Sequence, residues 1–401
     1  MSSPTGDRFP LLRLLVLAGA IFVSVSSEFL PTGLLPDIAG DLRVSESRVG
    51  LLVTVFAFTV VVSTGPLTLL TRGMPRKGLL VGLLAVFAIS NVLAGFAPSY
   101  ELLAGARILG GLAHGLFWAV ATPYTARLVP PGQLTRAIAI TTAGGSFAFI
   151  LGVPFTAAIG HAFGWRNAFL VMAALVVVFT VLALLLLPSV PSTHAPRAAP
   201  VAGSAVVRDR SLWGVVIVGV TVLLIATGHN LYYTYIAPWM IEVAGIPSDF
   251  VSVALLIFGV AGAFGLLISG AYGDKYPRLT HNAMALALIV TILLSGAFAR
   301  GILLTLVLLA LWSLAFGGLP SIFHSRALHS ASARTRDLSG AIVTIGFNLA
   351  IGGGALFGGL VYDGLGVEFV PFAGALIVAV GFVWAVSTDG LRARLHPADA
   401  P

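Results

Sequence analysis

Long apolar runs recur along the whole chain, and short segments rich in glycine, proline and charge separate them. A run of ~20 apolar residues is enough for a helix to cross the ~30 Å hydrocarbon core of a bilayer. The pattern therefore predicts an all-α polytopic membrane protein with twelve transmembrane helices. Their expected limits are 11–36, 47–71, 78–97, 100–126, 134–161, 166–188, 211–240, 249–272, 280–299, 301–323, 336–362 and 367–387.

The composition supports a membrane protein. Of the 401 residues, 58% are hydrophobic and 9% are charged, whereas about 25% are charged in an average soluble domain. Arg8 and Arg13 precede the first apolar run as in a signal peptide, but this run is too long and many others follow it. We expect it to be the first transmembrane helix. The chain has no cysteine, which excludes disulfides and thiolate metal sites.

The basic residues predict how the helices are oriented. Most of the 22 lysines and arginines fall on the side of the N-terminus, and only Arg43, Arg48, Arg166 and Arg300 fall on the other side. Because cytoplasmic loops carry an excess of Lys and Arg, we expect a multi-pass protein of the cell inner membrane with both termini in the cytoplasm. The net charge of +7 then reflects these loops and does not indicate nucleic-acid binding.

A change of composition divides the chain into two parts. Residues 189–210 are rich in Pro, Ala and Ser and have no apolar periodicity, which predicts a flexible cytoplasmic linker. It would join an N-terminal six-helix bundle (1–188) to a C-terminal six-helix bundle (211–401). Because six spans return the chain to the side on which it began, both parts have the same orientation in the membrane. They are therefore predicted to be parallel repeats around a central substrate path. A shift of 202 residues aligns Pro36 with Pro238, Gly115 with Gly317, Gly152 with Gly354, and Glu28 with Asn230.

Glu28 lies well inside the first apolar run. A carboxylate at the bilayer centre costs roughly 2.5–3.5 kcal/mol even on a lenient scale, so such residues usually face a bundle interior or a water-filled path. Ser24 and Thr32 share its helix stripe, because they are one turn before and one turn after it. We interpret Glu28 as a titrating group in a transport path, with a hydrogen-bonded structural acid as the alternative.

The fourth predicted span carries three further polar or aromatic side chains on one face. Arg107, His114 and Trp118 are separated by seven and four residues, which places them on one stripe of a helix. Arg107 should lie level with the later part of the first span and act as the counter-charge of Glu28. Histidine titrates near neutral pH, so His114 is a second candidate proton carrier, although it could also be a packing or binding residue. The predicted proton-coupling residues are Glu28, Arg107 and His114.

Hydroxyls, amides and aromatic rings gather in the seventh and eleventh spans. His229 and Tyr233 share one side of the seventh span, with Asn230 beside them, and Asn348 follows Thr344 by one turn in the eleventh. Such groups suit a polyol or a semi-polar ring better than a charged ligand. An interfacial aromatic belt is the alternative, above all for residues near the membrane surface. The predicted substrate-binding residues are Ser24, Thr32, Trp118, His229, Asn230, Tyr233 and Asn348.

The sequence lacks motifs of other functions. GxxxxGK[ST] and HExxH do not occur, and His324 and His329 stand among arginines without further ligands. No nucleophile, metal cluster or nucleotide site predicts an enzyme. We therefore expect no enzymatic activity, no metal and no cofactor beyond a proton gradient. A passive channel or a uniporter is a further alternative.

Four segments carry a resemblance to the major facilitator superfamily. SEFLPTGLLPDIAGDL (27–42) resembles the first-span signature of its bacterial drug/sugar:proton antiporters. ARILGGLAHGLFWA (106–119) and GGSFAFILGVPFTAAIG (144–160) are similar to their motifs in spans four and five, and GAYGDKYPR (270–278) resembles the loop motif GxLaDrxGrk. The resemblance implies the major facilitator fold and proton-driven export. It extends to sugar-efflux transporters of the arabinose and thiogalactoside type, and chloramphenicol exporters share much of the first span.

The resemblance also implies a gate on the cytoplasmic side. Asp274 is in register with the aspartate of the loop motif, whereas the first-half copy, GPLTLLTRGMPRK (65–77), keeps the basic cluster but has no aspartate. We expect these loops to hold the cytoplasmic side closed in the outward-facing state. The expected gating residues are Arg72, Arg76, Lys77, Asp274 and Lys275.

Together these patterns predict a proton-coupled secondary transporter that exports sugars or related small neutral molecules by alternating access. The alternative is a multidrug or chloramphenicol-type efflux antiporter. The expected partners are the small-molecule substrate, protons and the lipid bilayer, with no nucleic acid and with a monomer as the working unit.

Overall fold

The computed structural model describes residues 9–189, 209–332 and 335–395. These residues are almost entirely helical, and none of them forms a strand. Twelve helical segments among them are long and apolar enough to cross a membrane, which confirms the predicted fold class and number of spans. Residues 190–208, most of the predicted linker, lie outside the described residues.

The first six spans are built mainly from Leu, Val, Ile, Ala and Phe. Helices satisfy their own backbone hydrogen bonds, as hydrocarbon surroundings require. The elements of this N-terminal half are α1 (Leu11–Gly33), α2 (Leu35–Leu42), α3 (Glu46–Leu70), α4 (Arg76–Gly95), α5 (Tyr100–Ala126), η1 (Pro131–Gln133), α6 (Leu134–Phe147), η2 (Ala148–Gly152), α7 (Val153–Phe163) and α8 (Trp165–Leu186).

The last six spans follow the same plan. They begin after residue 210 and repeat the order of long helices and short connections. The elements of this C-terminal half are α10 (Ser211–Thr234), α11 (Ile236–Pro238), η3 (Trp239–Val243), η4 (Ser248–Phe250), α12 (Val251–Tyr272), α13 (Pro277–Phe298), α14 (Ile302–Gly317), α15 (Leu319–Ser330), α16 (Arg336–Leu365), η5 (Val367–Phe369) and α17 (Val370–Leu395).

The first span is shorter than the sequence predicts. Instead of a continuous helix over 11–36, α1 ends at Gly33, and Leu34 leaves helical geometry with φ −125° and ψ 18° before α2 begins. Pro36 in the first turn of α2 has no N–H for a continuous helix and crowds the preceding turn. The tenth predicted span is also divided before a proline, between α14 and α15, although Gly318 at the junction keeps near-helical angles of φ −90° and ψ −18°.

The fifth span is composite. It consists of α6, the π-helical turn η2 and α7, with Pro154 in the first turn of α7. Turns of this kind inside helices are frequent at functional positions. Here η2 packs against α12 of the other half, so the irregular turn lies at the contact between the halves.

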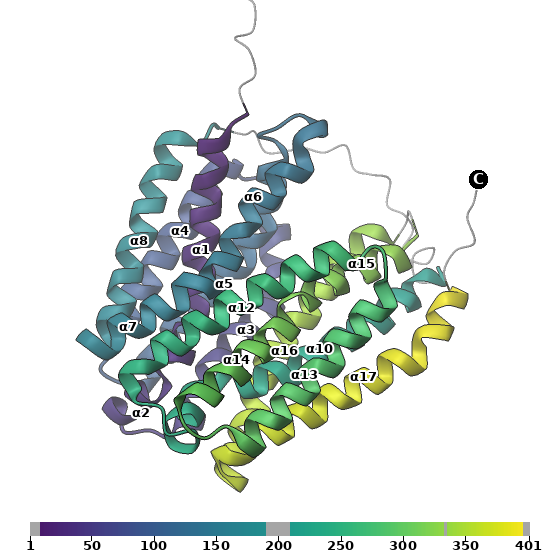
Figure 1. The fold of residues 1–401 in the computed structure, drawn as a ribbon. Coiled ribbons are helices and arrows are strands. Elements are labelled where there is room, and N and C mark those ends of the chain that lie inside the picture. The colour runs from purple at the N-terminus through teal and green to yellow at the C-terminus, as the bar shows by residue number, and fades with distance from the viewer. Residues whose placement is uncertain (1–8, 190–208, 333–334, 396–401) are drawn as a thin grey trace, which may run out of the picture.

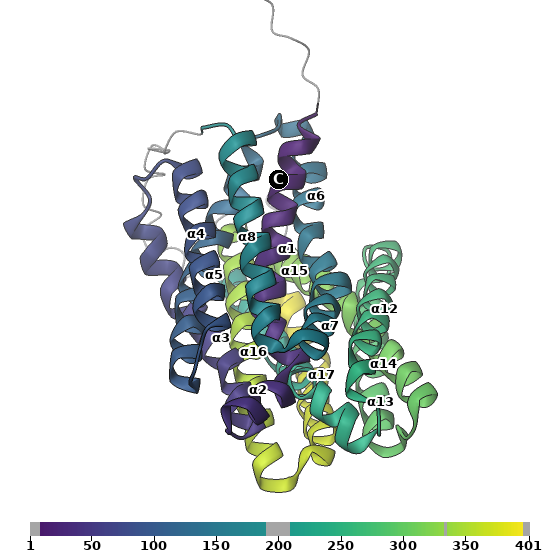
Figure 2. The same ribbon diagram turned by 90° about the vertical axis from the view of Figure 1, so that its left-hand side faces the viewer.

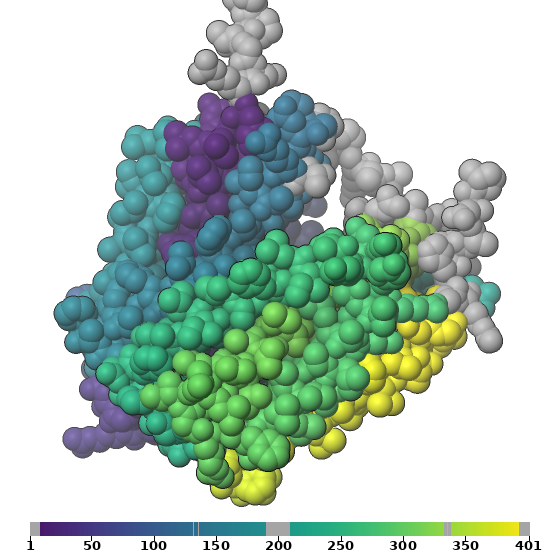
Figure 3. Space-filling view, in the orientation of Figure 1, coloured from purple at the N-terminus to yellow at the C-terminus, as the bar shows by residue number. Residues whose placement is uncertain are grey.

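The two halves meet along part of their length and separate at one end. Helix α3 packs on α16, α7 packs on α12, and α2 touches α11 near the ends of α1 and α10; Figure 2 shows α12 beside α7. In Figure 1 the halves diverge toward the end where α1 begins. The space-filling view shows a hollow there, between α6 and α15 (Figure 3). We call this the open end, and the end with α2 and α11 the closed end.

Glycine is required where helix backbones come closest. A Cβ atom on Gly144 would lie 2.0 Å from the carbonyl oxygen of Ala18, so α6 packs directly on the backbone of α1. Between the halves, a Cβ atom on Gly259 of α12 would lie 2.4 Å from the carbonyl oxygen of Phe149 in η2. Small residues allow this close approach in membrane helices. The contact of α12 with η2 therefore requires glycine at position 259.

Candidate functional site

A buried polar cluster joins α1 to α5 in the N-terminal half. Glu28 is 4% exposed, and its Oε2 atom lies 3.5 Å from Nε2 of His114. The other ring nitrogen of His114, Nδ1, lies 3.0 Å from the hydroxyl of Ser24, one turn before Glu28. The indole N–H of Trp118 donates to His114 Nε2 over 3.0 Å. The structure thus brings together four residues that the two sequence stripes place in the site.

These hydrogen bonds indicate the protonation of His114. An indole N–H can only donate, so His114 Nε2 accepts and carries no proton. In a neutral ring the proton is then on Nδ1, which donates to Ser24. Glu28 Oε2 lies 3.5 Å from the same Nε2, whose single lone pair accepts from the indole N–H, so an ionised carboxylate there would face a nitrogen that offers it no proton. The geometry therefore fits a protonated Glu28 carboxyl.

Arg107 reaches the same turn of α1 from α5 but binds the backbone. It is 3% exposed, and its Nη1 and Nη2 atoms donate to the carbonyl oxygens of Ser27 and Glu28 over 2.8 and 2.6 Å. Its guanidinium carbon lies 4.2 Å from the ring centroid of Phe56, a cation–π distance. Among the described residues, no ion pair within 4.0 Å joins Arg107 to the Glu28 carboxylate. The expected counter-charge is therefore close to Glu28 without binding its side chain.

Two members of the cluster escaped the sequence analysis. Ser27 donates from its hydroxyl to Asn91 Oδ1 over 2.8 Å, which joins α1 to α4. Phe56 packs edge-on against His114, with ring centroids 5.3 Å apart. Asn91 carried a detectable signal, because polar residues inside an apolar span usually face the bundle interior. Phe56 carried none, since phenylalanine is equally common on lipid-facing surfaces.

A second buried histidine lies among aromatic rings in the C-terminal half. The indole N–H of Trp312 donates to His229 Nδ1 over 3.1 Å. The His229 ring stacks on Phe316 with centroids 3.4 Å apart and lies parallel to Tyr233 at 5.7 Å. Tyr233 contacts Phe29 of the N-terminal half, with centroids 6.1 Å apart. The aromatic cluster therefore extends across the contact between the halves.

The interfacial belt considered for the seventh span does not fit the structure. Tyr235 and Trp239, which follow the predicted binding residues, have no exposed surface. A membrane-interface belt requires side chains that reach the headgroup region. Tyr235 packs against Tyr362 and donates to the carbonyl of Ala355, and Trp239 packs edge-on against Tyr232, so both rings lie inside the protein.

The two histidine clusters occupy related places in the two repeats. The 202-residue shift aligns Phe56 with Phe258, and these rings pack against His114 and His229 respectively. The N-terminal cluster adds Glu28 and an arginine, whereas the shift aligns Glu28 with an asparagine. Among the described residues, Glu28 is the only acid with a buried side chain. The buried acid therefore lies in the N-terminal half, and the C-terminal cluster consists mainly of aromatic rings.

The remaining predicted binding residues differ in their surroundings. The side-chain amides of Asn230 and Asn348 donate to backbone carbonyls one turn earlier on their own helices, over 2.8 and 3.0 Å. Thr32 Oγ1 is buried without a hydrogen-bond partner among the described residues. Of the predicted set, Trp118 and Asn348 are partly exposed and the others are buried. The reachable surface of the set comes from these two side chains, one from each half.

A tyrosine between two carboxylates joins the halves at the closed end. The hydroxyl of Tyr362 on α16 lies 2.8 Å from Glu46 Oε2 at the start of α3 and 2.9 Å from Glu242 Oε1 in η3. A hydroxyl has one proton, so it can donate to only one of the two carboxyl groups. The other contact requires a protonated carboxyl that donates to the hydroxyl oxygen. Tyr362, Glu46 and Glu242 therefore hold the closed end together, with one of the two carboxyl groups protonated.

Tyr362→Phe should weaken the closed end, because it removes the hydroxyl that bridges the carboxyl groups of Glu46 and Glu242. Hydrogen bonds to charged groups contribute about 1.5–3 kcal/mol, so the population open at this end should rise on the order of tenfold. Distances between spin labels at Gly40→Cys and Gly364→Cys measure it, since an added Cβ meets nothing within 4 Å at either site. Asp363→Asn is the control that removes a neighbouring charge. Unchanged distances in Tyr362→Phe would contradict this role.

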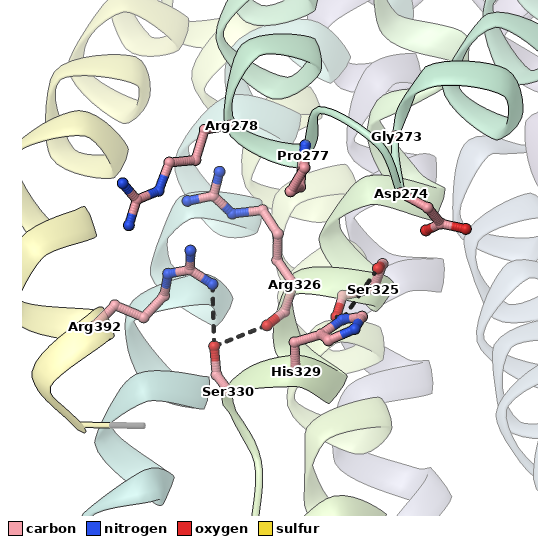
Figure 4. A pocket seen from close by; sticks show the side chains of 9 residues that line it. All are labelled: Gly273, Asp274, Pro277, Arg278, Ser325, Arg326, His329, Ser330 and Arg392. Atoms are coloured by element: carbon pink, nitrogen blue, oxygen red, sulfur yellow. Dashed lines mark hydrogen bonds between the residues drawn. The ribbon is translucent and has the colours of Figure 1, made fainter. Parts of the chain in front are cut away.

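The predicted gating residues lie at the open end and do not pair across it. Each ion pair within 4.0 Å among the described residues joins two residues of the same half, and none connects the two halves. Arg76 donates to the carbonyl of Arg72 over 3.4 Å, and Lys275 Nζ lies 5.1 Å from the Tyr276 ring centroid. Asp274 is exposed at the edge of a pocket in the C-terminal half (Figure 4). The predicted gate is therefore not engaged in this structure.

In the described part of the chain, no group of three or more His, Cys, Asp or Glu side chains lies together in a way that could hold a metal ion.

Twelve membrane helices in two halves, with a buried acid and histidine near the contact between them, define a membrane transporter rather than an enzyme. Residues 17–340 match the family model of the Major Facilitator Superfamily. The chain belongs to this superfamily, as its sequence motifs predict.

Relatives and solved structures agree with this assignment. The chain is 31% identical over 382 residues to a probable sugar efflux transporter of Mannheimia succiniciproducens, covering 95% of this chain and 94% of the relative. It is 30% identical over 383 residues to a probable sugar efflux transporter of Helicobacter pylori strain J99, covering 94% and 95%. A bacterial homologue of the human lysosomal transporter Spinster, in an inward-facing and occupied conformation, has the same fold, with a TM-score of 0.84 at 13% identity over 99% of this chain and all of that one.

Proposed function

We propose that this protein is a proton-coupled exporter of sugars or related small neutral molecules in a bacterial inner membrane. The observation that carries the proposal is the contact of the buried Glu28 carboxyl with His114 Nε2 at 3.5 Å, beside an arginine that binds the backbone. The relatives named as probable sugar efflux transporters support the substrate class. The hydroxyl, amide and aromatic side chains of the predicted binding set support a neutral ligand.

The arginine-rich loops support an orientation with both termini in the cytoplasm. The open end then faces the cytoplasm, and the structure corresponds to an inward-facing state with a proton on Glu28. The two bundles, 1–188 and 211–401, are proposed to rock about the contact of α3 with α16. One chain holds the whole proposed path, so we propose that it works as a monomer.

Proton release is proposed to reorganise the polar cluster. Loss of the proton from Glu28 leaves a carboxylate facing the His114 lone pair, which is unfavourable. The guanidinium of Arg107, now on the carbonyls of Ser27 and Glu28, is the nearest cation and would turn toward the new charge. This movement changes how α1 packs on α5. It would favour return to the outward-facing state, where Glu28 is protonated again from the outside.

Reconstituted protein should concentrate a sugar against its gradient when a proton gradient is imposed. Proteoliposomes with an imposed proton gradient that drives uptake should accumulate labelled arabinose or a thiogalactoside. A protonophore, which dissipates this gradient, should abolish the accumulation. In cells that express the protein, tolerance to the cationic dye ethidium should hardly change, because the predicted site has no spare carboxylate for a cation. Accumulation of chloramphenicol instead of both sugars would support the drug-export alternative. Strong ethidium protection without sugar transport would overturn the proposal.

A further inference from the structure

A pocket of about 410 Å³ lies at the open end of the C-terminal half, outside the proposed transport site. In Figure 4 the guanidinium groups of Arg278, Arg326 and Arg392 lie together on one side, and the carboxylate of Asp274 points away from them on the other. These arginines come from three helices, α13, α15 and α17. The lining residues are Gly273, Asp274, Pro277, Arg278, Ser325, Arg326, His329, Ser330 and Arg392.

The three arginines share one carboxylate. Arg326 and Asp389 form a close ion pair, Arg392 Nη2 lies 3.4 Å from Asp389 Oδ1, and Arg278 Nε lies 3.9 Å from Asp389 Oδ2. One carboxylate neutralises one guanidinium, so the cluster retains two positive charges. Arg326 is only 7% exposed, and a buried charge without full compensation is unfavourable. The cluster therefore has room for further negative charge.

Two guanidinium nitrogens in this cluster lack partners. Arg326 Nη1 and Arg392 Nε are buried and have no hydrogen-bond partner among the described residues. Buried N–H groups in folded proteins are nearly always hydrogen-bonded, and charged donors lose most when they are not. A ligand with several acceptor oxygens and a negative charge would compensate the guanidinium charges, and small rotations of the two side chains would turn these nitrogens toward it.

We propose that this pocket binds a phosphate group, carried either by an anionic lipid or by free phosphate. Guanidinium groups match phosphate oxygens in bidentate pairs, and three of them converge here. The surroundings favour the lipid. Leu279, Leu328 and Leu391, which are 67%, 47% and 53% exposed, are close in sequence to the three arginines and offer apolar surface for acyl chains. On the proposed orientation, the pocket lies at the cytoplasmic membrane surface, where anionic headgroups are present.

The test measures ligand binding to the purified full-length protein by native mass spectrometry and by the shift in unfolding temperature. The probes are phosphatidylglycerol, phosphatidylcholine as the zwitterionic lipid, and inorganic phosphate with chloride at matched ionic strength. Arg278→Gln and Arg392→Gln should each weaken phosphatidylglycerol binding about tenfold. The Arg278 side chain is 64% exposed, so its substitution leaves the core intact. Lys275→Gln is the matched control, because it removes one positive charge from the connection before α13, three residues from Arg278, without lining the pocket.

The probes distinguish the two sources of phosphate. Binding of phosphatidylglycerol that millimolar inorganic phosphate does not displace assigns the pocket to a lipid, whereas displacement assigns it to phosphate in general. The proposal is overturned when neither probe binds more tightly than its control, or when Lys275→Gln weakens binding as much as the two arginine variants do. None of these readouts depends on transport, so they stand apart from the proposed function.

Discussion

Glu28→Gln should abolish pH-driven accumulation of substrate and leave exchange of substrate intact. The amide has the shape of the protonated acid and, like it, places no negative charge beside His114 Nε2, so the cluster keeps its present geometry. It cannot release a proton, and Arg107 then has no new charge to approach. Accumulation driven by a pH gradient in inverted vesicles should fall to the level of protein-free vesicles. Counterflow, which exchanges labelled for unlabelled substrate without net proton movement, should remain.

His114→Asn is the matched variant on the opposite side of the same contact. An asparagine oxygen can still accept from Trp118, so transport should be weaker but still pH-dependent. Both variants require the same two measurements, counterflow and uptake driven by a pH gradient. A Glu28→Gln protein that still concentrates substrate, together with a His114→Asn protein that does not, would assign the proton to His114 instead.

Gly259→Leu should prevent the two halves from closing and stop transport. A Cβ at this position would lie 2.4 Å from the Phe149 carbonyl oxygen and 2.6 Å from the Cα of Ile150, both backbone atoms of η2. Overpacking of this kind typically costs about 1–3 kcal/mol, and separation of the halves relieves it without unfolding either bundle. Spin labels at Gly40→Cys and Gly364→Cys should therefore report longer distances at the closed end.

Gly270→Leu is the control for this variant. It adds the same side chain to the same helix, but nothing lies within 4 Å of a Cβ atom at position 270. Its label distances at the closed end should equal those of the unsubstituted protein. Wild-type distances and transport in Gly259→Leu would mean that η2 and α12 can shift apart, and that the contact does not control closure.

The sequence predicts the helices better than it predicts their breaks. Span number follows from hydropathy, because hydrocarbon accepts few polar groups and excludes unpaired backbone. The break at Leu34 depends on Pro36, yet Pro31 lies inside α1 without ending it. A proline inside an apolar run is tolerated when neighbouring helices satisfy the freed carbonyl. Which proline breaks the helix therefore depends on packing that the local sequence does not contain.

The polar cluster was predictable in part. Glu28 and His114 belong to regular helix stripes of chemically unusual residues, so each could be identified from a single span. The hydrogen-bond partner of Arg107 could not be predicted in this way. Whether its guanidinium meets a backbone carbonyl or the Glu28 carboxylate depends on the position of α5 along α1, to within about one helical turn. Tyr362 was not identified at all. It contacts Glu46 and Glu242 across the boundary between the halves, and no pattern within one span reports how two bundles meet.

One buried acid among the described residues, rather than two, would limit the gradient that an exporter of the proposed kind can maintain. A single carboxyl in the described part of the membrane core would carry one proton inward for each neutral molecule moved outward, so every cycle also transfers one positive charge. One pH unit contributes about 1.4 kcal/mol and each 100 mV about 2.3 kcal/mol. Their sum, about 3.7 kcal/mol, corresponds to a concentration ratio of about 500. Since the electrical part is the larger, the steepest outward gradient should depend more on membrane potential than on external acidity.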